Sequence, residues 1–243
     1  MALPTVLMYS KWRNDADKRL HERMQHLLGK TYPNLWWLWG EGDITDSTRL
    51  VLYDHTLGHP RVTVAECSTG LDAKNTDERL VRICTSDLIL LFKLDRAIKE
   101  GRWPKPDYIL FHESDLQTPP DIVERLLATG KDVVGGWPTL GEPEDGIFYD
   151  TWAYRGLDGR KFANTAPFHP DARHDAVFEV SSLGSVVLAP YQPFADGLRP
   201  SGFGALVEIC QKLRALGYSC WVDPSIPVIQ PRDLWEPVEH GSL

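Results

Sequence analysis

Two carboxylates separated by one residue, Glu113 and Asp115, offer the clearest chemistry in the sequence. They follow the apolar run 108–111, which has the length of a buried strand, and Thr118 with Pro119 then indicates the start of a helix. Ligands of open α/β sheets bind at the carboxyl ends of strands. In an extended chain both acids would point to the same side, where they can share one divalent cation and so neutralise a diphosphate. The alternative is that they are solvated strand-end or helix-capping acids.

Further candidates lie around this pair. Ser10, Lys11 and Arg13 end the first apolar run, and the two basic residues can approach a diphosphate, although simple solvation is an equal alternative. Glu179 follows an irregular segment suited to acceptor contacts, and its carboxylate can orient or deprotonate an acceptor hydroxyl unless it is only a surface acid. Trp137 and Trp152 either stack on the apolar face of a sugar or pack in the core. His112 is expected to be a packed, hydrogen-bonded residue and not a metal ligand.

The elements that must position these residues alternate in type. Short β-rich runs are followed by segments with apolar residues at helical spacing, which predicts an α/β domain with a mostly parallel central sheet flanked by helices. No internal repeat or linker divides the chain, so residues 1–243 are expected to form a single domain. The predicted strands cover 5–9, 35–39, 61–65, 108–111, 132–137, 178–180, 185–189 and 219–223, and the predicted helices 15–28, 49–55, 75–100, 119–128 and 206–217.

Composition narrows the function classes. The 243 residues carry a formal net charge of −8, which disfavours a nonspecific nucleic-acid binder. The four cysteines are far apart and form no C-x-x-C pair, which is typical of reduced thiols in a cytoplasmic protein. The N-terminus lacks a signal-peptide pattern and no apolar run is long enough to cross a bilayer, so we expect no membrane span.

Taken in order, several segments resemble nucleotide-sugar glycosyltransferases of the GT-A fold, including fungal Golgi mannosyltransferases and family-two-like transferases. The similarity covers most of residues 4–223. The matching segments are Arg13-Asn14, 32–34, 41–48, Glu113-Ser114-Asp115 in place of the D-x-D element, 149–152, 179–184 and 201–204.

The resemblance implies roles for individual residues. Residues 4–115 would form the nucleotide-binding half and 116–230 the acceptor side. Glu41 would contact the base of a UDP- or GDP-sugar, and Asp46 would cap the next helix. Asp115 is the firmer ligand of Mn²⁺ or Mg²⁺, with Glu113 beside it. Ser10, Lys11 and Arg13 would contact the donor, and Gly202 and Phe203 the acceptor, with Asp115 and Glu179 as the catalytic residues.

Two departures qualify this assignment. Many metal-dependent members have a His near the C-terminal edge, where this chain has Gln230, a weaker oxygen ligand. Inverting members place a carboxylate where this chain has Phe203-Gly204, which favours a retaining reaction. The sequence therefore predicts a metal-assisted hexosyltransferase. Its acceptor would be a glycan, a lipid-linked sugar, a protein or a hydroxymethylated base of viral DNA, as for a cytoplasmic, phage-encoded enzyme. A nucleotidyltransferase and a non-catalytic sugar-nucleotide-binding module are the alternatives.

Overall fold

A computed structural model describes residues 2–16, 19–71, 75–202 and 205–234. Within these ranges no helix is long and apolar enough to cross a membrane. The strands are β1 Val6–Trp12, β2 Leu35–Glu41, β3 Val62–Glu66, β4 Tyr108–His112, β5 Val133–Leu140, β6 Phe178–Val180, β7 Val186–Pro190 and β8 Cys220–Gln230. The helices are α1 Leu20–Leu28, α2 Thr48–Thr56, α3 Thr76–Lys99, α4 Ile122–Ala128, α5 Gln192–Ala195 and α6 Ala205–Ala215, with 3-10 turns η1 Pro143–Asp145 and η2 Arg232–Leu234.

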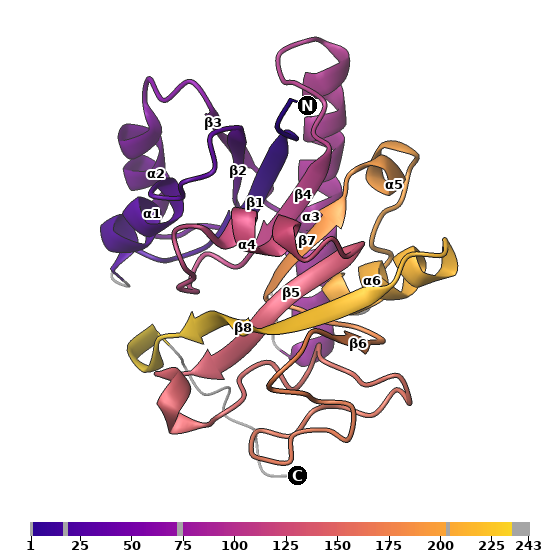
Figure 1. Cartoon of the computed structure of the whole chain (residues 1–243). Coiled ribbons are helices and arrows are strands. Elements are labelled where there is room, and N and C mark those ends of the chain that lie inside the picture. Colours follow the sequence, from indigo (N-terminus) through magenta and orange to yellow (C-terminus); the bar gives the residue numbers. More distant parts are fainter. Residues whose placement is uncertain (1, 17–18, 72–74, 203–204, 235–243) are drawn as a thin grey trace.

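All eight strands form one sheet in the order β3-β2-β1-β4-β7-β5-β8-β6. β3, β2, β1 and β4 are mutually parallel, and so are β5 and β8, whereas β7 and β6 run antiparallel to their neighbours. The predicted α/β architecture with a mostly parallel sheet is confirmed. Since β1, β2 and β4 are parallel, their carboxyl ends lie at the same edge of the sheet (Figure 1).

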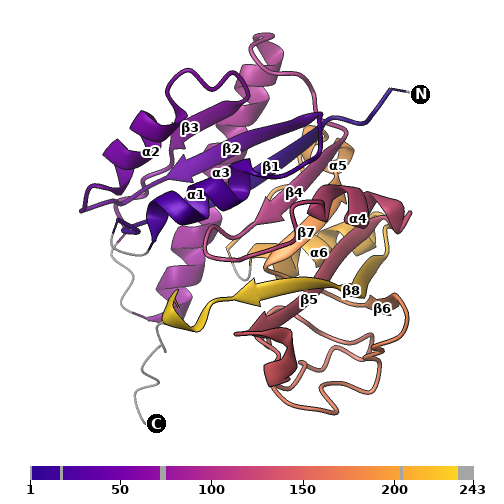
Figure 2. The same cartoon turned by 60° about the vertical axis from the view of Figure 1, so that its left-hand side comes forward.

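Helices cover both faces of the sheet (Figure 2). Leu20, Met24 and Leu27 recur at helical spacing and bury one side of α1 against the sheet, in a core shared with α2 and α4. Leu90 and Leu94 of α3 pack on the opposite face together with α6. The side chain of Asn75 accepts a hydrogen bond from Glu78 N and so begins α3 with the expected cap.

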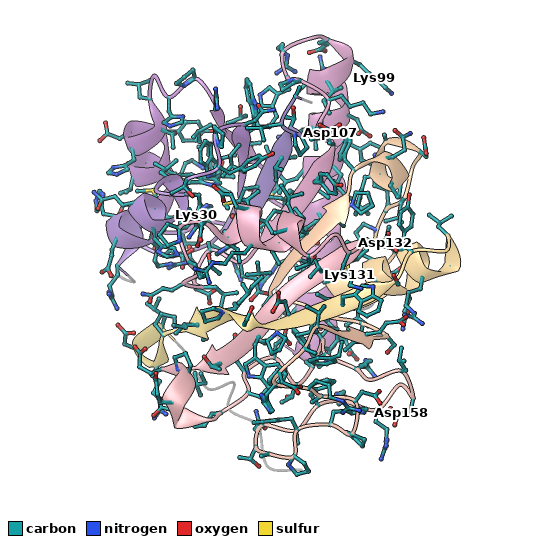
Figure 3. The ribbon with its side chains drawn as sticks, viewed as in Figure 1. Lys30, Lys99, Asp107, Lys131, Asp132 and Asp158 are labelled. Carbon is teal, nitrogen blue, oxygen red and sulfur yellow. The ribbon has the colours of Figure 1, made fainter. Side chains whose placement is uncertain are left out.

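An irregular insert between β5 and β6 packs around Trp137. Its ring lies 4.7 Å from Phe148 and 5.3 Å from Phe168, centroid to centroid, and only 9% of the residue is exposed. Trp137 therefore anchors the insert, and its ring is not presented as a sugar platform. In Figure 3, Asp158 of the insert and Asp107, which precedes β4, lie at opposite ends of the molecule, so the insert is on the side where β4 ends.

β5 and β8 are longer than the sequence indicates. They pair in parallel from Val133 and Cys220 as far as Leu140 and Gln230. Proline is usually excluded from central strands, so Pro138 and the prolines of β8 led to a prediction in which both strands end too early. A register shift between Gly135 and Trp137 accommodates the irregularity, and the pair carries Gln230 toward the end of β4.

Candidate active site

The predicted acid pair lies in a turn at the end of β4. The ladder of β4 stops at His112, and Leu116 N donates to Glu113 O at 3.3 Å across the turn. Gln117 then bridges to Ile229 of β8. The expectation that Glu113 and Asp115 alternate along an extended chain is therefore wrong, because the chain reverses between them. The charge of Asp115 nevertheless raises the pKa of Glu113.

Glu113 lies in an excess of negative charge. Its side chain is exposed, yet the protein around it removes enough water to raise the pKa of the carboxyl well above its usual range, and Asp115 and Asp150 raise it further. Lys11 and Arg79 act in the opposite sense without cancelling the increase. Such a group binds a cation or a proton readily.

Asp115 has different neighbours. Desolvation raises the pKa of its carboxyl, Arg23 and a hydrogen bond from Gln230 lower it, and Asp15 raises it again. Gln230 is 1% exposed, and its Oε1 atom has no hydrogen-bond partner among the described residues. An unpaired amide oxygen thus lies beside Asp115, at the position predicted for a weak third metal ligand.

Arg23 fixes the acid turn and was not predicted from the sequence. Its guanidinium, 7% exposed as a residue, donates from Nε to Ser114 O and from Nη2 to Ser114 Oγ, both at 3.0 Å. Nη1 forms an ion pair with Asp15 Oδ1 at 2.9 Å, and the guanidinium lies 5.1 Å from the centre of the Trp12 ring. Arg23 therefore joins α1, the loop after β1 and the acid turn in one buried network.

The insert contributes Tyr149 and Asp150, which lie in the matching segment 149–152 but were given no role from the sequence. Asp150 Oδ2 accepts from Ser185 Oγ at 2.7 Å, and Ser185 O accepts from Glu113 N at 3.1 Å. A Cβ atom on Gly184 would lie 2.4 Å from Asp150 Oδ2, so only glycine allows this contact. Desolvation and then the charges of Glu113, Asp115 and Asp150 raise the pKa of Tyr149, which remains a protonated hydrogen-bond donor.

The predicted donor contacts at the end of β1 differ in their exposure. Lys11 Nζ forms an ion pair with Asp87 Oδ1 at 2.6 Å on the α3 side, and its charge reaches Glu113. Ser10 is buried, and its Oγ atom has no partner among the described residues. Arg13 Nε donates to Asp43 O at 3.4 Å and points along the loop after β2.

Glu41 ends β2 at the same edge of the sheet. It is 1% exposed, and its carboxylate Oε2 accepts from Arg49 Nε at 2.9 Å. Burial raises the pKa of Glu41 and the bond to Arg49 lowers it. Asp46 Oδ1 accepts from Thr48 N at 2.9 Å, but the N-cap position of α2 is Ser47, so Asp46 lies one residue before the cap that the resemblance implied.

His112 is a packed residue, as predicted. Its Nδ1 atom lies 2.8 Å from Glu113 O and its Nε2 atom 2.9 Å from Thr118 Oγ1. A carbonyl only accepts, so Nδ1 donates and Nε2 accepts from the hydroxyl. Burial lowers the pKa of His112 to about 3, with Lys30 as a smaller cause, and the neutral ring has no free nitrogen for a metal.

The structure does not bring Glu179 to the acid turn. Glu179 lies on β6, the fourth strand from β4, which is a separation of roughly 19 Å at about 4.8 Å per strand. Its carboxylate forms an ion pair with Arg214 at 3.0 Å. Three other residues were predicted to contact the acceptor. Trp152 is 37% exposed near Asp150, and Gly202 has a φ of 141°. Phe203 lies outside the described residues.

The comparison with known proteins gives a fold but no close relative. No protein family and no curated protein matches the sequence. Among solved structures, the chain is similar to the mannosyltransferase PcManGT from Pyrobaculum calidifontis in complex with GDP-Man and Mn²⁺, with 14% identity and a TM-score of 0.56 over 99% of this chain and 59% of that one. It is also similar to S. aureus TarS 1–349 in complex with UDP-GlcNAc, with 11% identity and a TM-score of 0.59 over 98% of this chain and 62% of that one.

These identities are low, so the similarity concerns the fold. The chain spans about three fifths of the length of either structure. The described elements, with the acids at the end of β4, give this chain the GT-A-like fold of nucleotide-sugar glycosyltransferases.

Proposed function

We propose that this protein is a glycosyltransferase that moves a sugar from a UDP- or GDP-sugar to an acceptor hydroxyl, assisted by Mn²⁺ or Mg²⁺ at Glu113 and Asp115. One observation carries the proposal. Burial raises the pKa of both carboxyls at the end of β4, and the charges of Asp115 and Asp150 raise that of Glu113 further, in a fold whose solved examples hold GDP-Man with Mn²⁺ or UDP-GlcNAc. Perturbed acids of this kind are typical of functional sites.

The donor set suits a cation that is shared with a substrate. Among the residues that the structure describes, no three His, Cys, Asp or Glu side chains gather to hold a metal. Mg²⁺ is usually held by one or two carboxylates together with substrate phosphates, rather than by a protein cage. Asp115 and Glu113 provide those carboxylates, and the unpaired Oε1 of Gln230 offers a further oxygen. When bound, the cation would stabilise the negative charge that develops on the leaving diphosphate.

The protein's own groups complete the proposed site. Lys11 and Arg79 supply positive charge on the Glu113 side, where a diphosphate would lie. Tyr149, kept protonated, can donate a hydrogen bond to a phosphate or to the acceptor hydroxyl. Ser10, Arg13 and Glu41 remain the proposed donor contacts. Glu179 is left out as a catalytic group because it is distant and paired.

The acceptor and the stereochemistry are finer parts of the proposal. A net charge of −8 disfavours a hydroxymethylated DNA base and favours a glycan or another neutral hydroxyl compound. We further propose retention of the anomeric configuration, which NMR of the product would test. The four cysteines are free and buried, which suits a cytoplasmic protein.

Donor hydrolysis tests the proposal. The wild type should release nucleoside diphosphate from one member of a panel of UDP-glucose, UDP-GlcNAc and GDP-mannose when Mn²⁺ is present, and EDTA should stop the release. Asp115→Asn should slow this release by about 10²- to 10³-fold. Release of pyrophosphate from a nucleoside triphosphate and a sugar phosphate would instead show a nucleotidyltransferase. Binding without any turnover, even with acceptors added, would show a non-catalytic module.

A further inference from the structure

A polar cavity lies on the side of Asp115 that faces α1. It has a volume of about 340 Å³, and its wall includes Asp115 but not Glu113, Lys11, Tyr149 or Asp150. Asp115 therefore borders two spaces, the proposed diphosphate site and this cavity. The polar wall of the cavity is formed largely by Glu22, Arg23, Gln25, His26, Asp115 and Gln117.

The charges of this wall are already balanced. Arg19 forms ion pairs with Glu22 and, at 2.9 Å, with Asp233, while Arg23 pairs with Asp15. Burial, followed by the charge of Lys30, lowers the pKa of His26 to about 4, so the ring is neutral near pH 7. An anionic ligand would find no surplus cation on the described wall, which favours a neutral ligand.

Two amides of the wall are available to such a ligand. The side chains of Gln25 and Gln117 make no hydrogen bond to another described residue, and each offers both donors and an acceptor. Together with the carboxylate of Asp115, this set suits neighbouring hydroxyl groups, which both donate and accept. The volume is at the lower end of the roughly 300–1,000 Å³ typical of ligand sites, which limits the occupant to about one ring.

We propose that this cavity binds a single neutral hexose ring, with one of its hydroxyls on Asp115 and others on Gln25 and Gln117. The role of the ring rests on the proposed function: it is either the sugar of the donor or the terminal sugar of the acceptor. In both cases the chemistry of recognition is that of an uncharged polyol beside a carboxylate.

A pair of matched substitutions tests the proposal. Gln25→Trp fills the cavity from an exposed position of α1, and Gln211→Trp makes the same change at an exposed position of α6 outside the cavity. Gln117→Ala serves as a second cavity variant that removes only one amide. Thermal unfolding of each variant establishes that it is folded before binding is measured.

Two binding measurements distinguish the source of the ring. In the first, NMR saturation transfer follows the methyl glycosides of glucose, mannose, galactose and GlcNAc in the presence of nucleoside diphosphate and Mg²⁺. In the second, calorimetry compares nucleoside diphosphate with the intact nucleotide sugar. Gln25→Trp should weaken methyl glycoside binding at least tenfold if the ring belongs to the acceptor. If the ring belongs to the donor, Gln25→Trp should weaken binding of the nucleotide sugar and leave binding of the nucleoside diphosphate unchanged. Gln211→Trp should change neither by more than twofold.

Other outcomes overturn the inference. If Gln25→Trp and Gln117→Ala change neither measurement, the cavity is not a sugar site. If glucose 6-phosphate binds in the cavity better than methyl glucoside, the argument from balanced charge is wrong. A failure of the wild type to bind any nucleoside diphosphate would count against the proposed function instead, so the two failures are distinguishable.

Discussion

Glu113 and Glu179 are both glutamates that border the insert, yet they occupy opposite electrostatic environments. Glu113 faces Asp115 and Asp150, and its pKa is raised well above the usual range by desolvation and by these charges. Glu179 lies on the edge strand β6 in an ion pair with Arg214. Like charges held together cost stability and persist where a site needs them, whereas a paired surface acid has a structural explanation. The contrast supports the end of β4 as the proposed site.

The largest difference between the end of β4 and Glu179 is expected in catalytic turnover. Asp115→Asn should lower kcat/KM for metal-dependent sugar transfer or donor hydrolysis by about 10²- to 10³-fold, because the proposed cation loses its firmest ligand. Glu179→Gln, the matched loss of one carboxylate charge, should keep kcat/KM within about twofold. Steady-state kinetics with the active donor measure both. A larger loss for Glu179→Gln than for Asp115→Asn would reverse the comparison.

The buried support of the acid turn should show its effect in stability. Arg23→Met leaves Asp15 without its buried partner and Ser114 O without its donor, and should reduce the free energy of unfolding by about 3–5 kcal/mol. Arg125→Met, which removes an exposed pair with Asp121 on α4, is the control and should cost about 0.5 kcal/mol or less. Urea unfolding measures both values. Equal effects of the two substitutions would contradict the role of Arg23.

The pH dependence of stability should reveal the charge excess at Glu113. Because its pKa is higher in the folded state, folding is favoured while the group is protonated, and this contribution is lost as pH rises above about 4.3. Without metal, Glu113→Gln should match the wild type near this pH and exceed its melting temperature at neutral pH. Solvent screening limits the gain to a few degrees. A Glu113→Gln variant that is less stable than the wild type at neutral pH would exclude the charge excess.

The smallest effect is expected at the paired acid. Glu179→Gln removes one charge from an ion pair whose two side chains are each 33% exposed, and should change the free energy of unfolding by about 1 kcal/mol or less, in the direction of lower stability. High salt should reduce the difference. Thermal unfolding at low and high ionic strength measures it. A gain in stability would place Glu179 in a repulsive environment like that of Glu113.

Periodicity predicted the amphipathic helices because each buries one face, and short apolar runs predicted β1 and β4 because these strands are buried on both faces; α5 was not predicted. Leu20, Met24 and Leu27 give α1 its apolar side, and the alternation of strands and helices predicts the mostly parallel sheet that β1, β2 and β4 form. The ends of β5 and β8 were not predictable. Their prolines are local signals for a break, and only the pairing of the two strands with each other overrides them.

The position of the acids at a strand end could be predicted, but their surroundings could not. The turn at 113–116 depends on Arg23, which in the sequence is one polar position between the buried Leu20 and Met24. The pairing of Glu179 with Arg214 joins residues from β6 and α6, and no local pattern encodes it. The segment that contains Tyr149 was noticed through the resemblance, but its approach to the acids depends on the packing of the insert, a long-range contact that spacing does not report.

Calorimetric titration of UDP and GDP, each with and without Mn²⁺, into the wild type, Asp115→Asn and Glu179→Gln tests the central claim most directly. We expect one nucleotide to bind the wild type and Glu179→Gln with an affinity that Mn²⁺ increases at least tenfold, and Asp115→Asn to lose this dependence on the metal. Binding that is equally dependent on Mn²⁺ in Asp115→Asn, or lost in Glu179→Gln, would contradict a metal-bridged nucleotide site at the end of β4.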